Sequence, residues 1–187
     1  MQRQHRDTLS QTNRVVKAAR SRQLHRRPTA PRVQLYGGDR GRNEQNKMTT
    51  IYTAKVTVRS GRDGTIASDD GKLEARLAFP KSLGGDGAGT NPEQLLAAGY
   101  AACFGSTLTA VAKASGKVLS NVEIGAEVDM LHDAGTYDLA VRLIVNAKGA
   151  DRPALLGFIE QTLQACPYSR ATRHTLATSV VLATEVT

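Results

Sequence analysis

The 187-residue sequence has no tryptophan, only two cysteines and four histidines, and no long uninterrupted run of apolar residues. With no close Cys/His clustering, neither a structural zinc site nor the disulfide framework of a secreted domain is supported. No segment approaches the roughly 18 consecutive apolar residues of a membrane span, and the N-terminus lacks the apolar core of a secretion signal. These absences favour a soluble cytoplasmic domain without a bound metal, in which the two cysteines need a redox or a packing explanation.

Charge divides the chain into two regions. Residues 1–47 hold 12 Lys and Arg against 3 Asp and Glu, whereas residues 48–187 hold 13 against 14, so the first region supplies the net charge of +8. Its polar, aperiodic composition predicts a disordered basic leader, and one domain is expected over residues 48–187. One interpretation is that translation begins at Met48 and that the leader is an upstream extension. The alternatives are a targeting peptide and a nucleic-acid-binding tail, and the leader's single tyrosine argues against the latter because it offers little stacking.

Apolar residues alternate with period two in several segments, which is typical of half-buried strands. In the first segment the apolar face consists of Tyr52, Ala54, Val56 and Val58. The order β-β-β-α-β-β-α-β, without regular βαβ units, predicts an α+β fold with mostly antiparallel sheets. The alternating segments are 51–59, 72–79, 122–130 and 139–145, and residues 176–186 are predicted to close the domain with a strand.

A long, apolar helix is predicted over residues 91–116. Asn91 can act as the N-cap, Pro92 suits the first helical position, Gln94 completes a capping-box spacing, and Gly116 can end the helix. The helix is apolar almost all round and rich in small residues, so it belongs in the middle of the structure. A single domain of this size can hardly bury such a helix alone, which indicates a dimer.

Both cysteines occupy positions with possible chemical meaning. Cys103 lies midway along the apolar helix, and Cys166 follows a second predicted helix, residues 152–165, which Pro167 should end. Cys166 can then be the N-cap of a short following helix. A thiolate is stabilised at a helix N-terminus or beside a cation, whereas apolar surroundings raise the pKa of a thiol and make it inert. Each cysteine could therefore be a packing residue unless a partner activates it.

Arg62 and Glu93 are charged residues in locally awkward places. Arg62 lies in the turn SGRDG and Glu93 at the start of the apolar helix. Each also has an ordinary explanation, as a solvated turn residue and as a carboxylate that favours the helix dipole. Because about 15 Å of helical rise separates Glu93 from Cys103, the two cannot touch along one straight helix. If Glu93 serves Cys103, a kink or a neighbouring subunit must bring it there.

Four motifs together resemble the organic hydroperoxide resistance family of the Ohr/OsmC superfamily. The resemblance implies an OsmC-like fold, an intertwined homodimer with active sites at the dimer interface, and thiol peroxidase activity in oxidative stress defence. The leader has no counterpart in that family, and Arg170 stands where asparagine is more usual. The motifs are SGRDG (60–64), LGG (83–85), TNPEQLLAAGYAACF (90–104) and CPYSRAT (166–172).

The resemblance also implies roles for individual residues. Cys103 corresponds to the peroxidatic cysteine and Cys166 to the resolving cysteine, while Arg62 and Glu93 match the pair that holds the peroxidatic thiolate. Attack by Cys103 on a hydroperoxide would leave a sulfenic acid that condenses with Cys166 to a disulfide. An external dithiol, by resemblance a lipoyl group on a carrier protein, would reduce it, and no metal, haem or flavin is called for.

An apolar wall formed by Leu95, Phe104 and Tyr168 would explain a preference for alkyl and fatty-acid hydroperoxides over hydrogen peroxide. Two alternatives remain open. One is a non-enzymatic redox-sensing or binding protein whose Cys103–Cys166 disulfide alters partner affinity, with the leader as a docking tail. The other is an OsmC-type peroxidase with broader or hydrogen-peroxide-biased specificity.

Overall fold

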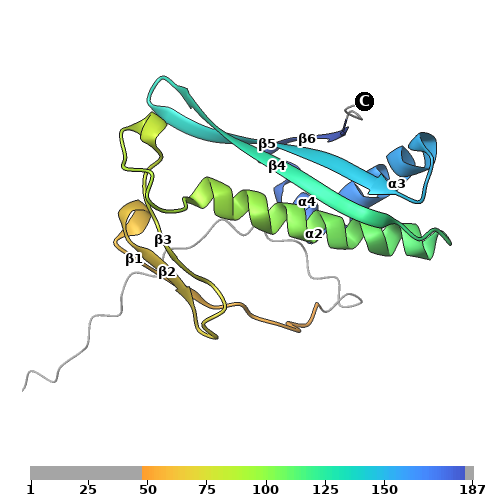
Figure 1. Cartoon of the computed structure of the whole chain (residues 1–187), viewed down its shortest axis with the longest axis horizontal. Helices are drawn as coiled ribbons and strands as arrows, with labels where there is room; N and C mark the ends of the chain where they lie inside the picture. Colours follow the sequence, from red (N-terminus) through yellow and green to blue (C-terminus); the bar gives the residue numbers. More distant parts are fainter. Residues whose placement is uncertain (1–47, 184–187) are drawn as a thin grey trace, which may run out of the picture. The chain divides into compact units, whose positions relative to one another are not determined.

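The computed structural model describes residues 48–183, so the predicted leader, residues 1–47, lies outside the described residues. Within this range two three-stranded sheets accompany a long helix, α2, and two shorter helices (Figure 1). The architecture is α+β, as predicted.

The first sheet is a small antiparallel meander. Its strands are β1 (Val56–Arg59), β2 (Thr65–Ser68) and β3 (Glu74–Arg76), in the order β1-β2-β3. The prediction of a half-buried strand over 51–59 is wrong in its first half, because residues 51–55 form no strand. It is also wrong about burial: Val56 and Val58 are 48% and 50% exposed, because β1 is an edge strand whose apolar face no described element covers.

The second sheet contains the predicted long hairpin. β4 (Ser120–Asp133) and β5 (Thr136–Lys148) pair antiparallel around a tight turn in which Ala134 and Gly135 both have positive φ. The last strand, β6 (Ala177–Leu182), pairs with β5 in parallel. This single parallel pair arises because α3 and α4 carry the chain back before β6 begins, and the other strand pairs are antiparallel, as predicted.

Helix α2 (Pro92–Ala114) begins and ends where the sequence predicts. The side chain of Asn91 accepts a hydrogen bond of 2.9 Å from the backbone N–H of Gln94, and Pro92 occupies the first turn. The side chain of Gln94 does not complete the capping box but accepts a hydrogen bond from Thr90. Gly116, just beyond the end of α2, has φ of 73°, a left-handed conformation that glycine adopts without steric cost.

One face of α2 forms the centre of the core. Its buried residues recur every four positions and pack against the inner face of the β4–β5 hairpin and against α3 (Figure 1). By length and composition alone α2 could cross a membrane, but the core helix of a globular domain passes the same test. The central buried residues are Tyr100, Phe104, Leu108 and Ala112 from α2; Val141, Leu143 and Val145 from β5; and Leu155, Phe158 and Ile159 from the next helix.

Helices α3 (Arg152–Ala165) and α4 (Pro167–Thr172) flank Cys166 as predicted. The side chain of Asp151, which the sequence analysis did not single out, caps α3 by accepting a hydrogen bond from the N–H of Ala154. Cys166 has extended backbone geometry and is the N-cap residue of α4, with Pro167 at the first helical position. The chain therefore bends sharply at Cys166 and turns its side chain into the core.

Candidate active site

The fold brings the two cysteines together. The thiol of Cys166 donates a hydrogen bond to the sulfur of Cys103, with 3.4 Å between the two Sγ atoms, although 63 residues separate them in sequence. A disulfide has an S–S distance of about 2.05 Å, so a small approach of the two side chains would close the bond. Cys166 is fully buried and Cys103 is partly exposed, which makes Cys103 the sulfur that a small reagent reaches first.

The surroundings of Cys103 within one subunit favour the thiol over the thiolate. Burial raises the pKa of Cys103, and the adjacent Cys166 sulfur raises it further. A hydrogen bond from the backbone N–H of Tyr168, at the start of α4, acts in the opposite direction and lowers the pKa. Among residues 48–183 no cation is among the groups that shift this pKa, although a neighbouring cation is one of the usual means of stabilising a thiolate.

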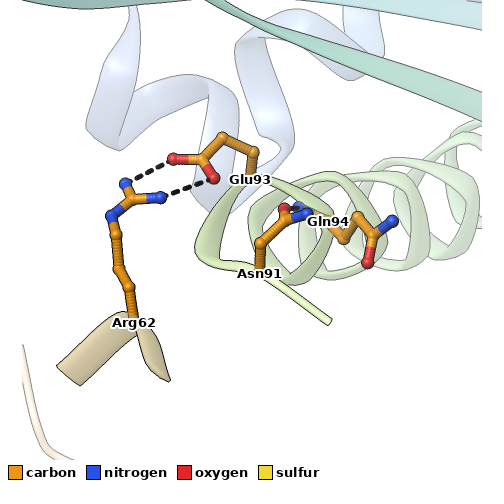
Figure 2. A network of polar contacts seen from close by, with 4 residues as sticks. All are labelled: Arg62, Asn91, Glu93 and Gln94. Atoms are coloured by element: carbon orange, nitrogen blue, oxygen red, sulfur yellow. Dashed lines mark hydrogen bonds and ion pairs between the residues drawn. The ribbon is translucent and has the colours of Figure 1, made fainter. Parts of the chain in front are cut away.

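Arg62 and Glu93 form a bidentate ion pair (Figure 2). Arg62 lies on the short 3-10 helix η1 (Gly61–Asp63), and Glu93 lies in the first turn of α2. The guanidinium nitrogens stand 2.9 Å and 2.6 Å from the two carboxylate oxygens of Glu93. The hydrogen bonds from Arg62 lower the pKa of Glu93, and the carboxylate in turn raises the pKa of Arg62, so both groups are charged. Arg62 also lies over the Phe79 ring, 5.9 Å from its centroid.

The ion pair and the cysteine pair do not meet within one chain. Helix α2 runs without a break from Pro92 to Ala114, and Glu93 and Cys103 are ten residues apart on it. The helix therefore separates them by about 15 Å along its axis. The kink that would have brought Glu93 to Cys103 along α2 is absent.

The three residues of the expected apolar wall lie in different environments. Phe104 is fully buried in the core, Leu95 is partly buried, and Tyr168 is exposed, with its ring 5.6 Å from that of Tyr100. An open cavity of about 330 Å³ lies instead beside Glu93. Its lining is Pro80, Ser82, Leu83, Asn91, Glu93, Val128, Asp129 and Met130.

The face of α2 opposite the core is built from small residues and remains open. A groove of about 400 Å³ runs along it beside strand β4. The lining residues are Ala101, Ala102, Gly105, Ser106, Thr109, Val122 and Ile124. Among residues 48–183 no cluster of three or more His, Cys, Asp or Glu side chains is arranged to hold a metal ion.

A buried contact between α2 and α4 was missed by the sequence analysis. The hydroxyl of Tyr100 donates a hydrogen bond of 3.0 Å to the hydroxyl of Ser169, and both side chains are buried. The available signal was spacing, since Tyr100 precedes Cys103 by three residues and Ser169 follows Cys166 by three.

This chain is similar in sequence to proteins of one known family. The sequence model of the family described as OsmC-like protein matches residues 84–181. The organic hydroperoxide resistance protein OhrB of Bacillus subtilis is 44% identical over 125 residues, which cover 66% of this chain and 91% of the relative. The organic hydroperoxide resistance protein of Xanthomonas axonopodis pv. citri is 41% identical over 135 residues, covering 71% and 95% of the two chains.

Solved structures agree with the sequence comparison. The crystal structure of Bacillus subtilis OhrB superposes with a TM-score of 0.66 at 41% identity, covering 72% of this chain and all of that one. An organic hydroperoxide resistance protein from Legionella pneumophila superposes with a TM-score of 0.69 at 34% identity, covering 73% of this chain and 100% of that one.

Proposed function

Because the chain belongs to the OsmC-like family, we propose that it serves in defence against peroxides as a thiol peroxidase that reduces organic hydroperoxides to alcohols. The observation that carries this proposal is the 3.4 Å approach of a partly exposed sulfur, Cys103, to a buried one, Cys166. Relatives named organic hydroperoxide resistance proteins, at 41–44% identity, give the substrate class.

The proposed cycle uses the two sulfurs in sequence. The Cys103 thiolate attacks the distal oxygen of ROOH, the O–O bond breaks, and the alkoxide takes up a proton to leave as ROH. Cys103 is thereby oxidised to a sulfenic acid. The Cys166 sulfur then attacks the Cys103 sulfur and expels water, which forms the disulfide.

The thiolate requires a positive neighbour, and we assign this role to Arg62 of the partner subunit in a homodimer. The 2.9 Å and 2.6 Å hydrogen bonds to Glu93 fix the guanidinium, so that it can favour the thiolate and the charge that develops on the peroxide oxygens. The exposed apolar face of β1 and the small-residue groove on α2 support such an assembly, since no described element covers either of them.

A dithiol outside the protein would complete the cycle, and we propose a lipoyl group on a carrier protein in the cytoplasm. Thiol–disulfide exchange begins with attack by a thiolate on an accessible sulfur. Of the two sulfurs Cys103 is the more exposed, so the incoming dithiol would form its mixed disulfide there and release Cys166. The cycle needs no bound metal, haem or flavin.

Dihydrolipoamide-dependent consumption of tert-butyl hydroperoxide tests the proposal, with the wild-type protein beside Cys103→Ser. We expect sustained turnover in the wild type and none in Cys103→Ser, while Cys166→Ser reacts once and stalls. Full turnover by Cys103→Ser would refute the assignment of roles. A wild type that forms the disulfide once, without turnover in excess dithiol, would instead favour a redox sensor.

A further inference from the structure

A second pair of residues joins α2 to α4, one helical turn from the cysteines. On α2, Tyr100 precedes Cys103 by three residues, and Ser169 follows Cys166 by three residues in the segment that forms α4. The 3.0 Å Tyr100–Ser169 hydrogen bond therefore joins the same two segments as the 3.4 Å sulfur contact, three residues away on each of them. Both partners of the hydroxyl pair are almost fully buried, so water does not compete for the bond.

The Tyr168 side chain of α4 lies closely against α2 at this point. A Cβ atom added at Gly99 would lie 2.8 Å from the hydroxyl oxygen of Tyr168, which is shorter than a normal van der Waals contact. The Tyr168 ring also packs beside that of Tyr100, with 5.6 Å between their centroids. A side chain at position 99 would therefore require the Tyr168 ring to shift. Helix α4 is thus held against α2 by a polar bond, a ring contact and a glycine.

Besides α2, helix α4 makes several contacts only with α3 among the described elements, and it is separated from α3 by Cys166 alone. It contains six residues, and the side chain of its N-cap residue, Cys166, makes no capping hydrogen bond because it points at Cys103. A short helix of this kind is marginal by itself and depends on tertiary contacts. A shift of α4 would move the Cys166 sulfur directly, since this residue begins the helix.

We propose that Tyr100 and Ser169 are positioning residues for disulfide formation: their hydrogen bond holds α4 where the Cys166 sulfur can attack the oxidised Cys103. This inference rests on the proposed peroxidase cycle. The affected step is Cys103–SOH + HS–Cys166 → Cys103–S–S–Cys166 + H₂O, in which the S–O bond breaks, the S–S bond forms, and the thiol proton leaves with the hydroxyl as water. The earlier attack of Cys103 on the peroxide forms no bond to Cys166. A shift of α4 would withdraw both the Tyr168 N–H, which lowers the pKa of Cys103, and the Cys166 sulfur, which raises it, so these changes oppose each other and the first step should change less than disulfide formation.

Loss of the bond should therefore expose the sulfenic acid for longer. A sulfenic acid that waits for its thiol can react with a second peroxide and become a sulfinic acid, which an external dithiol does not reduce. Weak positioning thus predicts over-oxidation as well as slow closure, whereas general destabilisation would slow both chemical steps.

Rapid-quench experiments on the full chain separate the two steps. Reduced protein is mixed with one equivalent of cumene hydroperoxide to time disulfide formation, and with several equivalents to follow over-oxidation. The sulfenic acid (trapped with dimedone), disulfide and sulfinic acid are quantified by mass spectrometry. A misplacement of about 1 Å can cost about 100-fold in a positioned reaction. Loss of one hydroxyl should displace α4 by less than this, so we expect Tyr100→Phe and Ser169→Ala each to slow disulfide formation about tenfold. The first step, measured as peroxide consumption, should stay within about twofold of wild type.

The double variant tests whether the two hydroxyls act on disulfide formation through their mutual hydrogen bond. If the two hydroxyls act only through their mutual bond, Tyr100→Phe/Ser169→Ala should close no more slowly than either single variant. Tyr137→Phe is the matched control, since it removes a hydroxyl from an exposed tyrosine on β5 and should behave as wild type.

Disulfide formation within twofold of wild type in both single variants would overturn the inference, and so would a parallel loss of both steps. These outcomes differ from failure of the peroxidase proposal. That failure would appear without any change at Tyr100 or Ser169, as equal peroxide consumption by the wild type and by Cys103→Ser.

Discussion

Replacing Arg62 with glutamine tests whether this residue activates Cys103, and the structure sets the size of the effect. Along one α2 helix the ion pair lies about 15 Å from Cys103, where two unit charges interact by about 1 kcal/mol at an effective dielectric constant of 20. Salt screens charges separated by more than about 8 Å, and Glu93 cancels most of the guanidinium's field at that distance. Within one chain, Arg62→Gln should therefore change the reactivity of Cys103 very little.

Across a subunit interface the expected effect is large. A guanidinium about 4 Å from the thiolate contributes about 4 kcal/mol at the same dielectric constant. Partial exposure of Arg62 and its bond to Glu93 reduce this value, but even about 1.4 kcal/mol corresponds to a tenfold change in thiolate population. Loss of the cation raises the pKa of Cys103. We therefore expect Arg62→Gln to slow alkylation of Cys103 at pH 7 by about tenfold or more.

The assay is the rate of iodoacetamide alkylation between pH 5 and 11, in a Cys166→Ser background that leaves one thiol. The profile of Arg62→Gln should move to higher pH and reach the same plateau as the parent, since thiolate reactivity itself is retained. Arg76→Gln is the matched control, because Arg76 forms a similar ion pair with Asp86 on the surface, at 2.7 Å. Superimposable profiles for Arg62→Gln and its parent, or equal shifts in both arginine variants, would refute the argument.

Mixing two inactive variants tells which chain supplies the arginine. Subunits that carry Arg62→Gln retain Cys103, and Cys103→Ser subunits retain Arg62, so a mixed dimer has one complete site if the arginine crosses the interface. Random pairing makes about half of the dimers mixed, which should restore about a quarter of the wild-type peroxidase activity. No recovery after unfolding and joint refolding would show that each site is built from one chain.

Three further outcomes follow from the described contacts. Because Arg62 lowers the pKa of Glu93, the charged carboxylate contributes stability above the unfolded-state pKa of about 4.3, and this stability is lost as the pH falls. Urea denaturation should find Glu93→Gln about 1 kcal/mol less stable than wild type at pH 7 and equal to wild type near pH 3. An equal deficit at both pH values would contradict the ion-pair argument. Phe104→Ala should lower the free energy of unfolding by about 3–5 kcal/mol, because Phe104 is fully buried, whereas Val118→Ala at an 81% exposed position should cost under about 0.5 kcal/mol; similar losses would contradict the placement of Phe104 in the core. Cumene hydroperoxide should react with Cys103 at least about tenfold faster than hydrogen peroxide, since burying two CH₂ equivalents is worth about 1.6 kcal/mol, and equal rate constants would exclude an apolar substrate site.

The helices and the long hairpin were predictable because their signals are local. Asn91, Pro92 and Gly116 fix the limits of α2 through capping and backbone preferences that depend only on neighbouring residues. Pro167 likewise ends α3 and makes Cys166 the N-cap of α4. The bidentate Arg62–Glu93 pair and the cysteine contact could be expected only from resemblance, because each joins residues far apart in sequence.

The burial of β1 could not be predicted from its alternation. Period-two patterning shows that Val56 and Val58 share a face, but it does not tell which element, or which subunit, covers that face. The burial of Phe104 in the core, rather than in the expected apolar wall, could not be predicted for the same reason. On a helix that is apolar on all sides, the sequence does not show which side faces the hairpin and which side is left for another partner. The Tyr100–Ser169 bond was missed because its three-residue spacing from Cys103 and Cys166 becomes informative only once the two cysteines are known to meet.

Helix α2 connects these observations to the proposed chemistry. It carries the ion-paired Glu93 at its first turn and Cys103 ten residues later, so the fold that fixes both residues also keeps them apart in one chain. In a two-fold dimer, a contact from Arg62 of one subunit to Cys103 of the other is necessarily repeated in reverse, and one interface completes two sites. The small residues on the open face of α2 would then leave room for a second subunit, as Gly99 leaves room for the Tyr168 side chain of α4. On this argument, thiolate reactivity and subunit association are properties of the same helix, and a substitution that enlarges a side chain in that groove should lower both together.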